Sequence, residues 1–163
     1  MPAVATPEPL AAPIDRVASL PAAMAPALTG VAQDPAKASA LLDLVNGARA
    51  KDGVALLERD AALDAVALAR ARNLLTNGYF DHYAPDGESA FSELAARGIH
   101  YRLAGENLAR NNYIESRTVQ AAFDGLMGSP GHRANILEER FAHAGIAAVQ
   151  SGHMWVYVTV FKD

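Results

Sequence analysis

Three side chains of this sequence, His82, Glu106 and His132, have the chemistry of a metal site or a proton-transfer site. Two imidazoles and a carboxylate can hold Zn²⁺ and leave one coordination position open for water or a ligand. The same groups can donate and accept protons without a metal. Because they lie far apart in the chain, their spacing does not show whether they meet. The alternative is structural: Glu106 would pair with Arg133 or accept backbone N–H groups, and both histidines would be ordinary hydrogen-bonded side chains.

His132 follows a helix-start signal. Ser129 is expected to cap a helix, because its hydroxyl can accept a bond from a backbone N–H that has no partner inside the helix. Pro130 suits the first helical position, where the missing N–H has no consequence. His132 would then lie in the first turn, where the positive end of the helix dipole disfavours the imidazolium form. A neutral imidazole is the form that binds a metal or accepts a proton.

His82 and Glu106 also occur in distinctive local settings. His82 lies between the end of a predicted helix and a Pro-Asp-Gly sequence at 85–87, which is typical of a type I turn and would fix the loop. Glu106 is an acid between a glycine and an asparagine, in a segment that otherwise looks buried. A buried acid must be paired, hydrogen-bonded or protonated. Both residues are therefore candidates for a shared site.

Two common hydrolase signatures are missing from the sequence. No Gly-x-Ser-x-Gly motif surrounds Ser129, although this serine lies three residues before His132. The H-E-x-x-H zinc motif is absent as well. Catalysis by a nucleophilic serine or by a helix-borne zinc site is not indicated.

The composition is that of one globular domain. Of the 163 residues, 51% are hydrophobic and 20% are charged, which is ordinary for a soluble protein. A net charge of −4 argues against binding to nucleic acid, which requires a basic surface. No apolar run is long enough to cross a bilayer. With no cysteine, disulfides and thiolate chemistry are both excluded.

Residues 1–35 differ from the rest of the chain. Seven of the nine prolines lie here, at 2, 7, 9, 13, 21, 26 and 35, among alanines. Proline at this density blocks helix and sheet hydrogen bonds, so we expect an extended, poorly packed leader or linker. The alternative is an export signal with Arg16, an apolar run over 17–28 and a small-residue end at 30–32, although Pro21 and Pro26 interrupt that run. The folded domain is expected over 36–163.

Apolar residues at helical spacing predict four helices, at about 36–51, 60–77, 89–97 and 116–127. Glycines at 53, 78 and 98 are expected to end the first three. In the first helix, Asn46 and Arg49 are placed off the apolar stripe, with surface or hydrogen-bonding roles.

The end of the chain reads as a β-hairpin. Strands are predicted over 144–149 and 154–161, joined by a four-residue loop at 150–153, and 101–103 is read as strand-like. In the last strand, Trp155, Tyr157, Thr159 and Phe161 point one way and the three valines the other. Because both faces are apolar, helices must cover both sides of the sheet. The predicted fold is therefore an α-β-α sandwich of three layers.

Several motifs together resemble the bacterial branch of the CAP superfamily (cysteine-rich secretory proteins, antigen 5 and pathogenesis-related 1), also called the SCP domain. The resemblance covers about residues 38–162 and rests on five stretches in the same order: Leu44-Val45-Asn46-Gly47-Ala48-Arg49, Phe80-Asp81-His82-Tyr83-Ala84-Pro85-Asp86-Gly87, Gly105-Glu106-Asn107-Leu108-Ala109, Ser129-Pro130-Gly131-His132-Arg133-Ala134-Asn135-Ile136-Leu137 and Met154-Trp155-Val156-Tyr157-Val158-Thr159-Val160-Phe161.

The resemblance implies an α+β fold, a three-layer sandwich with a mainly antiparallel central sheet. It also implies an open cleft with His82, Glu106 and His132 as its residues, supported by the side chains at Asn107, Ser129, Arg133 and Asn135. Some members hold a divalent metal on such histidines, and some eukaryotic members bind lipids. Members are mostly exported, and no single enzymatic activity unites them.

The sequence departs from the family pattern at two positions. Eukaryotic members carry a second glutamate in the helix before the second histidine, where this chain ends in Leu126-Met127-Gly128-Ser129. Without that acid, a complete His/Glu tetrad is not expected, and we predict that any metal is held weakly. Leu126 also stands where the bacterial pattern usually has tryptophan.

The sequence thus predicts a secreted, periplasmic or cell-envelope protein whose His/Glu-lined cleft binds a ligand or partner, without established catalysis. Zn²⁺ or another divalent metal is the cofactor to test, with His82, His132 and Glu106 as ligands. One alternative is a metal-assisted hydrolase using the same three residues. The other is a lipid-binding carrier. We expect a monomer whose partner is a small molecule, a lipid or a protein, with no nucleic-acid partner and no transmembrane segment.

Overall fold

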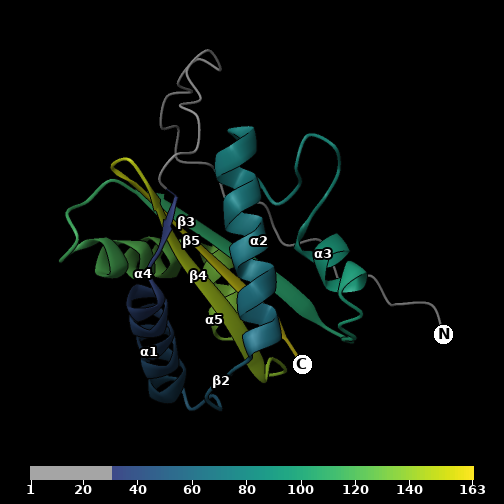
Figure 1. Ribbon diagram of the computed structural model, residues 1–163. Coiled ribbons are helices and arrows are strands. Elements are labelled where there is room, and N and C mark those ends of the chain that lie inside the picture. Colours follow the sequence, from purple (N-terminus) through teal and green to yellow (C-terminus); the bar gives the residue numbers. More distant parts are fainter. Residues whose placement is uncertain (1–30) are drawn as a thin grey trace.

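The structure, a computed structural model, describes residues 31–163 (Figure 1). Its helices are α1 (Pro35–Lys51), α2 (Ala61–Asn77), α3 (Ala90–Ala96), α4 (Thr118–Gly128) and α5 (Pro130–Ile136). Its strands are β1 (Ala32–Gln33), β2 (Glu58–Arg59), β3 (Ala104–Asn111), β4 (His143–Ser151) and β5 (Met154–Lys162). Most of the predicted leader, including its possible export signal, lies outside the described residues. Its last residues do not: β1 and the start of α1 already belong to the folded domain.

One sheet forms the centre of the domain, with the strand order β1-β4-β5-β3. All pairs on this path are antiparallel, and the two-residue strand β2 adds a short parallel pairing to β4. Strand β3 pairs with β5 over its whole length and is the outer strand on that side. The sheet is therefore mainly antiparallel, as predicted.

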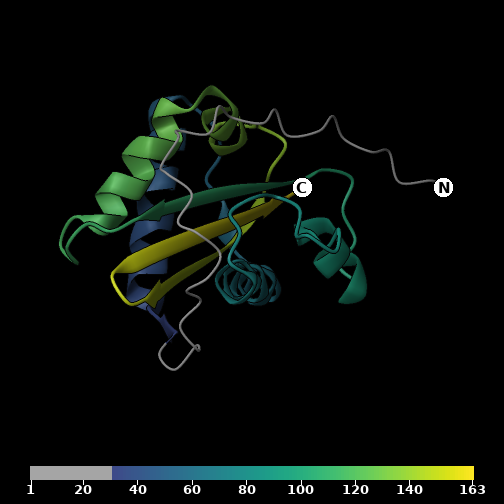
Figure 2. The same ribbon diagram turned by 90° about the horizontal axis from the view of Figure 1, so that it is seen from above.

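Helices cover both faces of the sheet, which confirms the three-layer sandwich (Figure 2). Helices α1, α4 and α5 lie on one face, and α2 and α3 on the other. Strand β5 explains this arrangement. Its residues Trp155, Tyr157 and Phe161 belong to one hydrophobic cluster, whereas its three valines belong to the opposite one. The alternation predicted from the sequence is confirmed.

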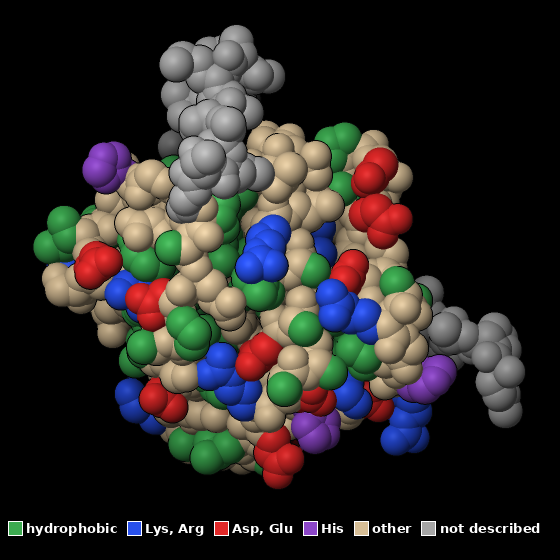
Figure 3. Space-filling view, in the orientation of Figure 1, with side chains coloured by type: hydrophobic (Ala, Val, Ile, Leu, Met, Phe, Trp, Pro, Cys, Tyr) green, Lys and Arg blue, Asp and Glu red, His purple; other side chains and the backbone are tan. Residues whose placement is uncertain are grey.

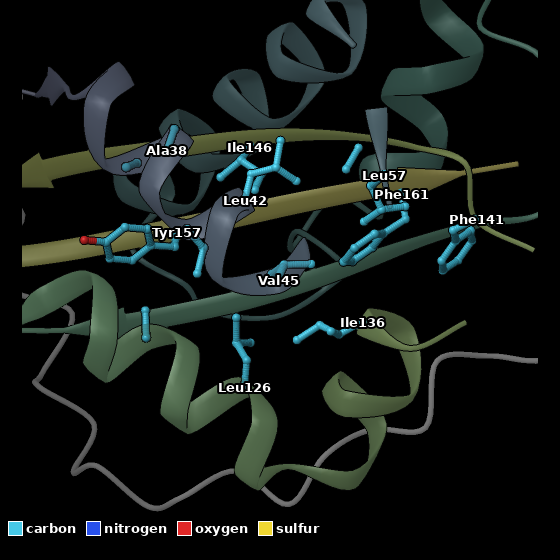
Figure 4. Close-up of a cluster of buried hydrophobic side chains, with 14 of the residues drawn as sticks. Ala38, Leu42, Val45, Leu57, Leu126, Ile136, Phe141, Ile146, Tyr157 and Phe161 are labelled. Atoms are coloured by element: carbon cyan, nitrogen blue, oxygen red, sulfur yellow. The ribbon is translucent and has the colours of Figure 1, made fainter. Parts of the chain in front are cut away.

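The core on the α1 side joins three helices to the sheet (Figure 4). Its labelled members include Leu42 and Val45 of α1, Leu126 of α4, Ile136 of α5, and Ile146, Tyr157 and Phe161 of the sheet. Burial of these side chains stabilises the fold by about 25 cal/mol per Å² of apolar surface. It also fixes α5, the helix that carries His132.

The predicted helix signals agree with the structure in most places. Asp60 caps α2 by accepting bonds from the N–H groups of Ala62 and Leu63, and Gly78 ends it in the left-handed conformation at φ 64°. The turn at 85–87 is also present, since the Gly87 N–H donates to the Ala84 carbonyl at 2.8 Å. These two features fix both ends of the segment that carries His82.

Two strand predictions were wrong. The strand near residue 101 begins at Ala104, because the backbone N–H groups of Arg102 and Leu103 donate to the Asp163 carboxylate instead of to a strand. The hairpin loop is shorter than four residues: only Gly152 and His153 lie between β4 and β5. Gly152 has φ 59°, which lets the tighter turn form.

The placement of Arg49 outside the apolar stripe was also wrong. Arg49 follows Val45 by four residues, one helical turn later on the same face, and its side chain is completely buried. Its guanidinium donates to four backbone carbonyls, those of Ala55, Ile136, Glu138 and Phe141. It links α1 to the end of α5 and to the loop before β4.

Charges of both signs are mixed on the surface over α2 (Figure 3). On the face shown, acidic and basic side chains are interspersed, and no broad area carries one sign. Among residues 31–163, no helix combines the length and apolar character needed to cross a bilayer.

Candidate functional site

Glu106 is buried and is held in a hydrogen-bonded network. Only 1% of its surface is exposed, and it projects from β3 toward the α2 side of the sheet. One carboxylate oxygen lies 2.9 Å from Nδ1 of His82. Of the three outcomes expected for a buried acid (paired, hydrogen-bonded or protonated), the structure shows hydrogen-bonded contacts, and His82 is one of the partners.

The second partner is Arg70 of α2, which the sequence reasoning missed. Its Nε donates to Oε2 of Glu106 at 2.8 Å, and a terminal nitrogen lies 3.3 Å from Oε1. Pairing with Arg133, one form of the structural alternative, does not occur: Arg133 lies 4.0 Å from Asp52 instead. Burial alone lowers the pKa of Arg70, but the hydrogen bond and charge of Glu106 outweigh it and raise the pKa above its usual value.

His132 lies in the first turn of α5, as predicted, and strand β3 holds it by its backbone. The side-chain amide of Asn107 donates to the His132 carbonyl at 3.0 Å, and Asn135 donates to the Asn107 side chain at 2.9 Å. Asn107 is 1% exposed, so this contact is sheltered from water. Two of the predicted supporting residues thus position the helix that carries His132.

Two neighbouring residues of strand β3 therefore contact the two histidines. Successive side chains of a strand point to opposite faces. Glu106 points to the α2 side and meets the His82 ring, while Asn107 points to the α5 side and meets the His132 backbone. Strand β3 therefore contacts the ring of His82 through Glu106 and the backbone of His132 through Asn107.

Burial lowers the pKa of His132, and the nearby His82 lowers it further through like charge. The predicted direction agrees with the structure, in which burial and the charge of His82 are the causes. No protein group within residues 31–163 contributes a hydrogen bond to this shift. The His132 ring is therefore held in the neutral form by its surroundings.

We expect the pKa of His132 to rise in His82→Ala, because the like charge is removed, and to stay below the ordinary value, because burial remains. NMR titration of the imidazole C–H signals measures this. As pH falls below about 6.5, the unfolded chain protonates His132 before the folded chain does, so His132 makes folding less stable at acid pH. An unchanged His132 titration in His82→Ala would show that the two rings do not interact.

Ser129 starts α5 as predicted, but its hydroxyl does not cap the helix. The Ser129 carbonyl accepts from the Arg133 N–H at 2.8 Å, while the side chain makes no capping bond. Its Oγ is buried without a hydrogen-bond partner among the described residues, and nothing in the structure explains this. Ser129 and Arg133 therefore make no hydrogen bond or ion pair with the two histidines or Glu106.

Two hollows of the domain are lined by neighbours of His82, Glu106 and His132 and not by these three residues themselves. One, of about 180 Å³, is lined by residues that include Arg70. The other, of about 300 Å³, lies where α4 meets α5 and includes Arg133. Among residues 31–163, no group of three or more His, Cys, Asp or Glu side chains is arranged to hold a metal ion.

Comparison with known proteins identifies the family. The profile of the cysteine-rich secretory protein (CAP) family matches residues 42–162. The uncharacterized protein YkwD of Bacillus subtilis is 35% identical over 122 residues, which are 75% of this chain and 46% of YkwD. The uncharacterized membrane protein YlbC of the same organism is 34% identical over 65% of this chain and 30% of its own length. The chain thus spans less than half of these relatives.

Solved structures share the fold. An extracellular protein of Bacillus anthracis that contains an SCP domain superposes with a TM-score of 0.68 at 27% identity, over 79% of this chain and 41% of that one. An outer surface protein of Borrelia burgdorferi superposes with a TM-score of 0.73 at 20% identity, over 82% of this chain and 98% of that one. On the profile match and the shared fold, this chain belongs to the cysteine-rich secretory protein (CAP) family.

Proposed function

We propose that this chain is an exported CAP-domain binding module whose ligand contacts the imidazoles of His82 and His132. The hydrogen bond from His82 Nδ1 to Glu106 carries the proposal. It turns the ring so that Nε2 is the nitrogen left for a ligand, and 19% of the His82 side chain is exposed. The location of the Bacillus anthracis relative supports export.

A divalent metal of the Zn²⁺ type is the ligand that these groups suit. Neutral imidazoles are its common ligands, and a metal-binding histidine usually donates its other ring N–H to a carboxylate. Glu106 has that relation to His82, and its two oxygens already face Arg70 and His82. We therefore propose that His82 and His132 are the ligands and that Glu106 orients His82.

Two protein ligands are fewer than the three or four of known zinc sites, so binding is expected to be weak. A metal bound here would lower the pKa of a coordinated water, which is the chemistry that the hydrolase alternative requires.

Calorimetric titration of the full chain with Zn²⁺ at pH 7.5 tests the proposal. We expect saturable binding of one ion, its loss in His82→Ala and in His132→Ala, and a roughly tenfold weaker affinity in Glu106→Gln. His153→Ala, at the exposed hairpin turn, is the matched control and should bind like the wild type. No uptake by the wild type, or uptake unaffected by both histidine changes, contradicts the metal site.

A hydrolase substrate panel then separates the two classes of function. Turnover that disappears with chelator and with either histidine variant would replace the binding module with the enzyme. Saturable Zn²⁺ uptake without turnover supports the binding module.

A further inference from the structure

We infer that Arg70 is a positioning residue of the histidine site: it directs the oxygens of residue 106 and thereby sets the tautomer of His82. The inference deepens the proposed function and rests on it for its biological meaning. It concerns a residue whose side-chain hydrogen bonds go to Glu106 and to the segment that carries His82.

The guanidinium of Arg70 connects three parts of the fold. Besides Glu106, it donates to the carbonyls of Asp81 and His82, at 3.1 and 3.0 Å, and to the Tyr79 hydroxyl at 2.8 Å. Only 3% of Arg70 is exposed. This one buried side chain therefore connects helix α2, the segment that carries His82, and strand β3.

Arginine suits this position because its planar group presents five N–H donors in a fixed fork. It contacts both carboxylate oxygens and, at the same time, two carbonyls of the segment that carries His82. Lysine has three donors around one point charge and cannot make this set of contacts.

The consequence for His82 follows from donor and acceptor rules. Because the guanidinium of Arg70 only donates hydrogen bonds, the side chain of residue 106 must turn an oxygen toward it. An ionised carboxylate also has an oxygen for His82, so His82 Nδ1 carries the proton and Nε2 keeps its lone pair. A ligand that needs a lone pair, as a metal ion does, can bind only this tautomer through Nε2.

Glu106→Gln separates the effect of Arg70 from that of residue 106. With Arg70 present, the amide oxygen of Gln should take the place of Oε2, which accepts from Arg70 Nε at 2.8 Å, because the contact of Arg70 with Oε1 is longer, at 3.3 Å. The NH₂ group then faces His82 and requires Nδ1 to be an acceptor. The proton of neutral His82 then moves to Nε2. In the double variant Arg70→Met with Glu106→Gln, the amide is free to turn its oxygen toward His82, and the Nδ1–H tautomer returns.

The test is long-range ¹H–¹⁵N NMR of the metal-free full chain at pH 7.5, which identifies the protonated ring nitrogen. We expect Nδ1–H in the wild type, Nε2–H in Glu106→Gln, and Nδ1–H again in the double variant. Arg72→Met with Glu106→Gln is the matched control, since Arg72 is exposed on the same helix, and it should behave like Glu106→Gln.

Equal His82 tautomers in Glu106→Gln and in the double variant would overturn the inference, as would Nε2–H in the wild type. If Glu106→Gln does not fold, the double variant, which leaves no unpaired buried charge, is used alone. It should then show at least tenfold faster amide exchange at Ala84, which donates to Glu88 at 2.8 Å, because the segment around His82 has lost its tie to α2.

Unchanged protection at Ala84 in the double variant contradicts the positioning role. Because no metal is present in these measurements, a wild-type chain that binds no Zn²⁺ contradicts the proposed function and leaves the tautomer result standing.

Discussion

Gly145→Ala is expected to destabilise the protein by about 3 kcal/mol or more, or to prevent folding, because the added Cβ has no room. It would overlap backbone atoms of α2, the carbonyl group of Leu63 and the nitrogen of Asp64. Backbone atoms cannot rotate away as a side chain can. The close approach is fixed by the Asp64 carboxylate, which accepts from the Ile146 N–H at 2.8 Å.

Urea unfolding followed by circular dichroism measures this effect. The matched control is Gly47→Ala in α1, where no atom lies within 4 Å of the added Cβ. There, alanine should stabilise the helix by up to about 1 kcal/mol. A Gly145→Ala protein as stable as the wild type would mean that α2 lies farther from β4 than described.

Arg49→Met is expected to cost about 3–5 kcal/mol, because methionine fills similar space but donates no hydrogen bond. The carbonyls of Ile136 and Phe141, at 2.8 and 3.0 Å, would lose their donors in a buried place, and the Ala55 carbonyl, at 2.7 Å, would lose its donor nearer the surface. Since one of them ends α5, the change also loosens the helix that carries His132.

The same urea experiment measures Arg49→Met, with Arg72→Met as the control. Arg72 is exposed on α2, so its removal should change the free energy of unfolding by less than about 0.5 kcal/mol. Similar stability of the two variants would show that the buried carbonyls find other donors.

Local patterns were enough to predict the helices and the hairpin. Each helix has an apolar stripe, and features such as Asp60, Gly78 and the turn at 85–87 act over a few residues. The last strand, apolar on both sides, was sufficient to predict covered faces and hence three layers. These signals do not depend on distant parts of the chain.

Strand β3 was harder to locate from sequence. Its residues, Ala-Gly-Glu-Asn-Leu-Ala-Arg-Asn, include no β-branched or aromatic side chain. It is a strand because it pairs with β5, which follows about 45 residues later. Tertiary pairing of this kind cannot be derived from local propensity.

The partners of the site were missed for a related reason. The sequence was enough to name His82, Glu106 and His132 as candidates. The contact between Arg70 and Glu106, however, joins positions 36 residues apart. One signal was present: Arg70 lies on the same helical face as the core residues Val66, Ala67 and Leu74. Arg49 occupies the equivalent place after Val45. An arginine within an apolar stripe indicates a buried acceptor to be found elsewhere.

Because β3 contacts both histidines, it limits how far the two segments that carry them can shift relative to each other. The ring of His82 is tied to Glu106 on the α2 side, and the backbone of His132 is tied to Asn107 on the α5 side, so two adjacent residues of β3 link the segments that carry the histidines. The distance between these two points of attachment is therefore set by the sheet and not by the lengths of surface loops. Loops around the site can change in length and composition without moving these attachments.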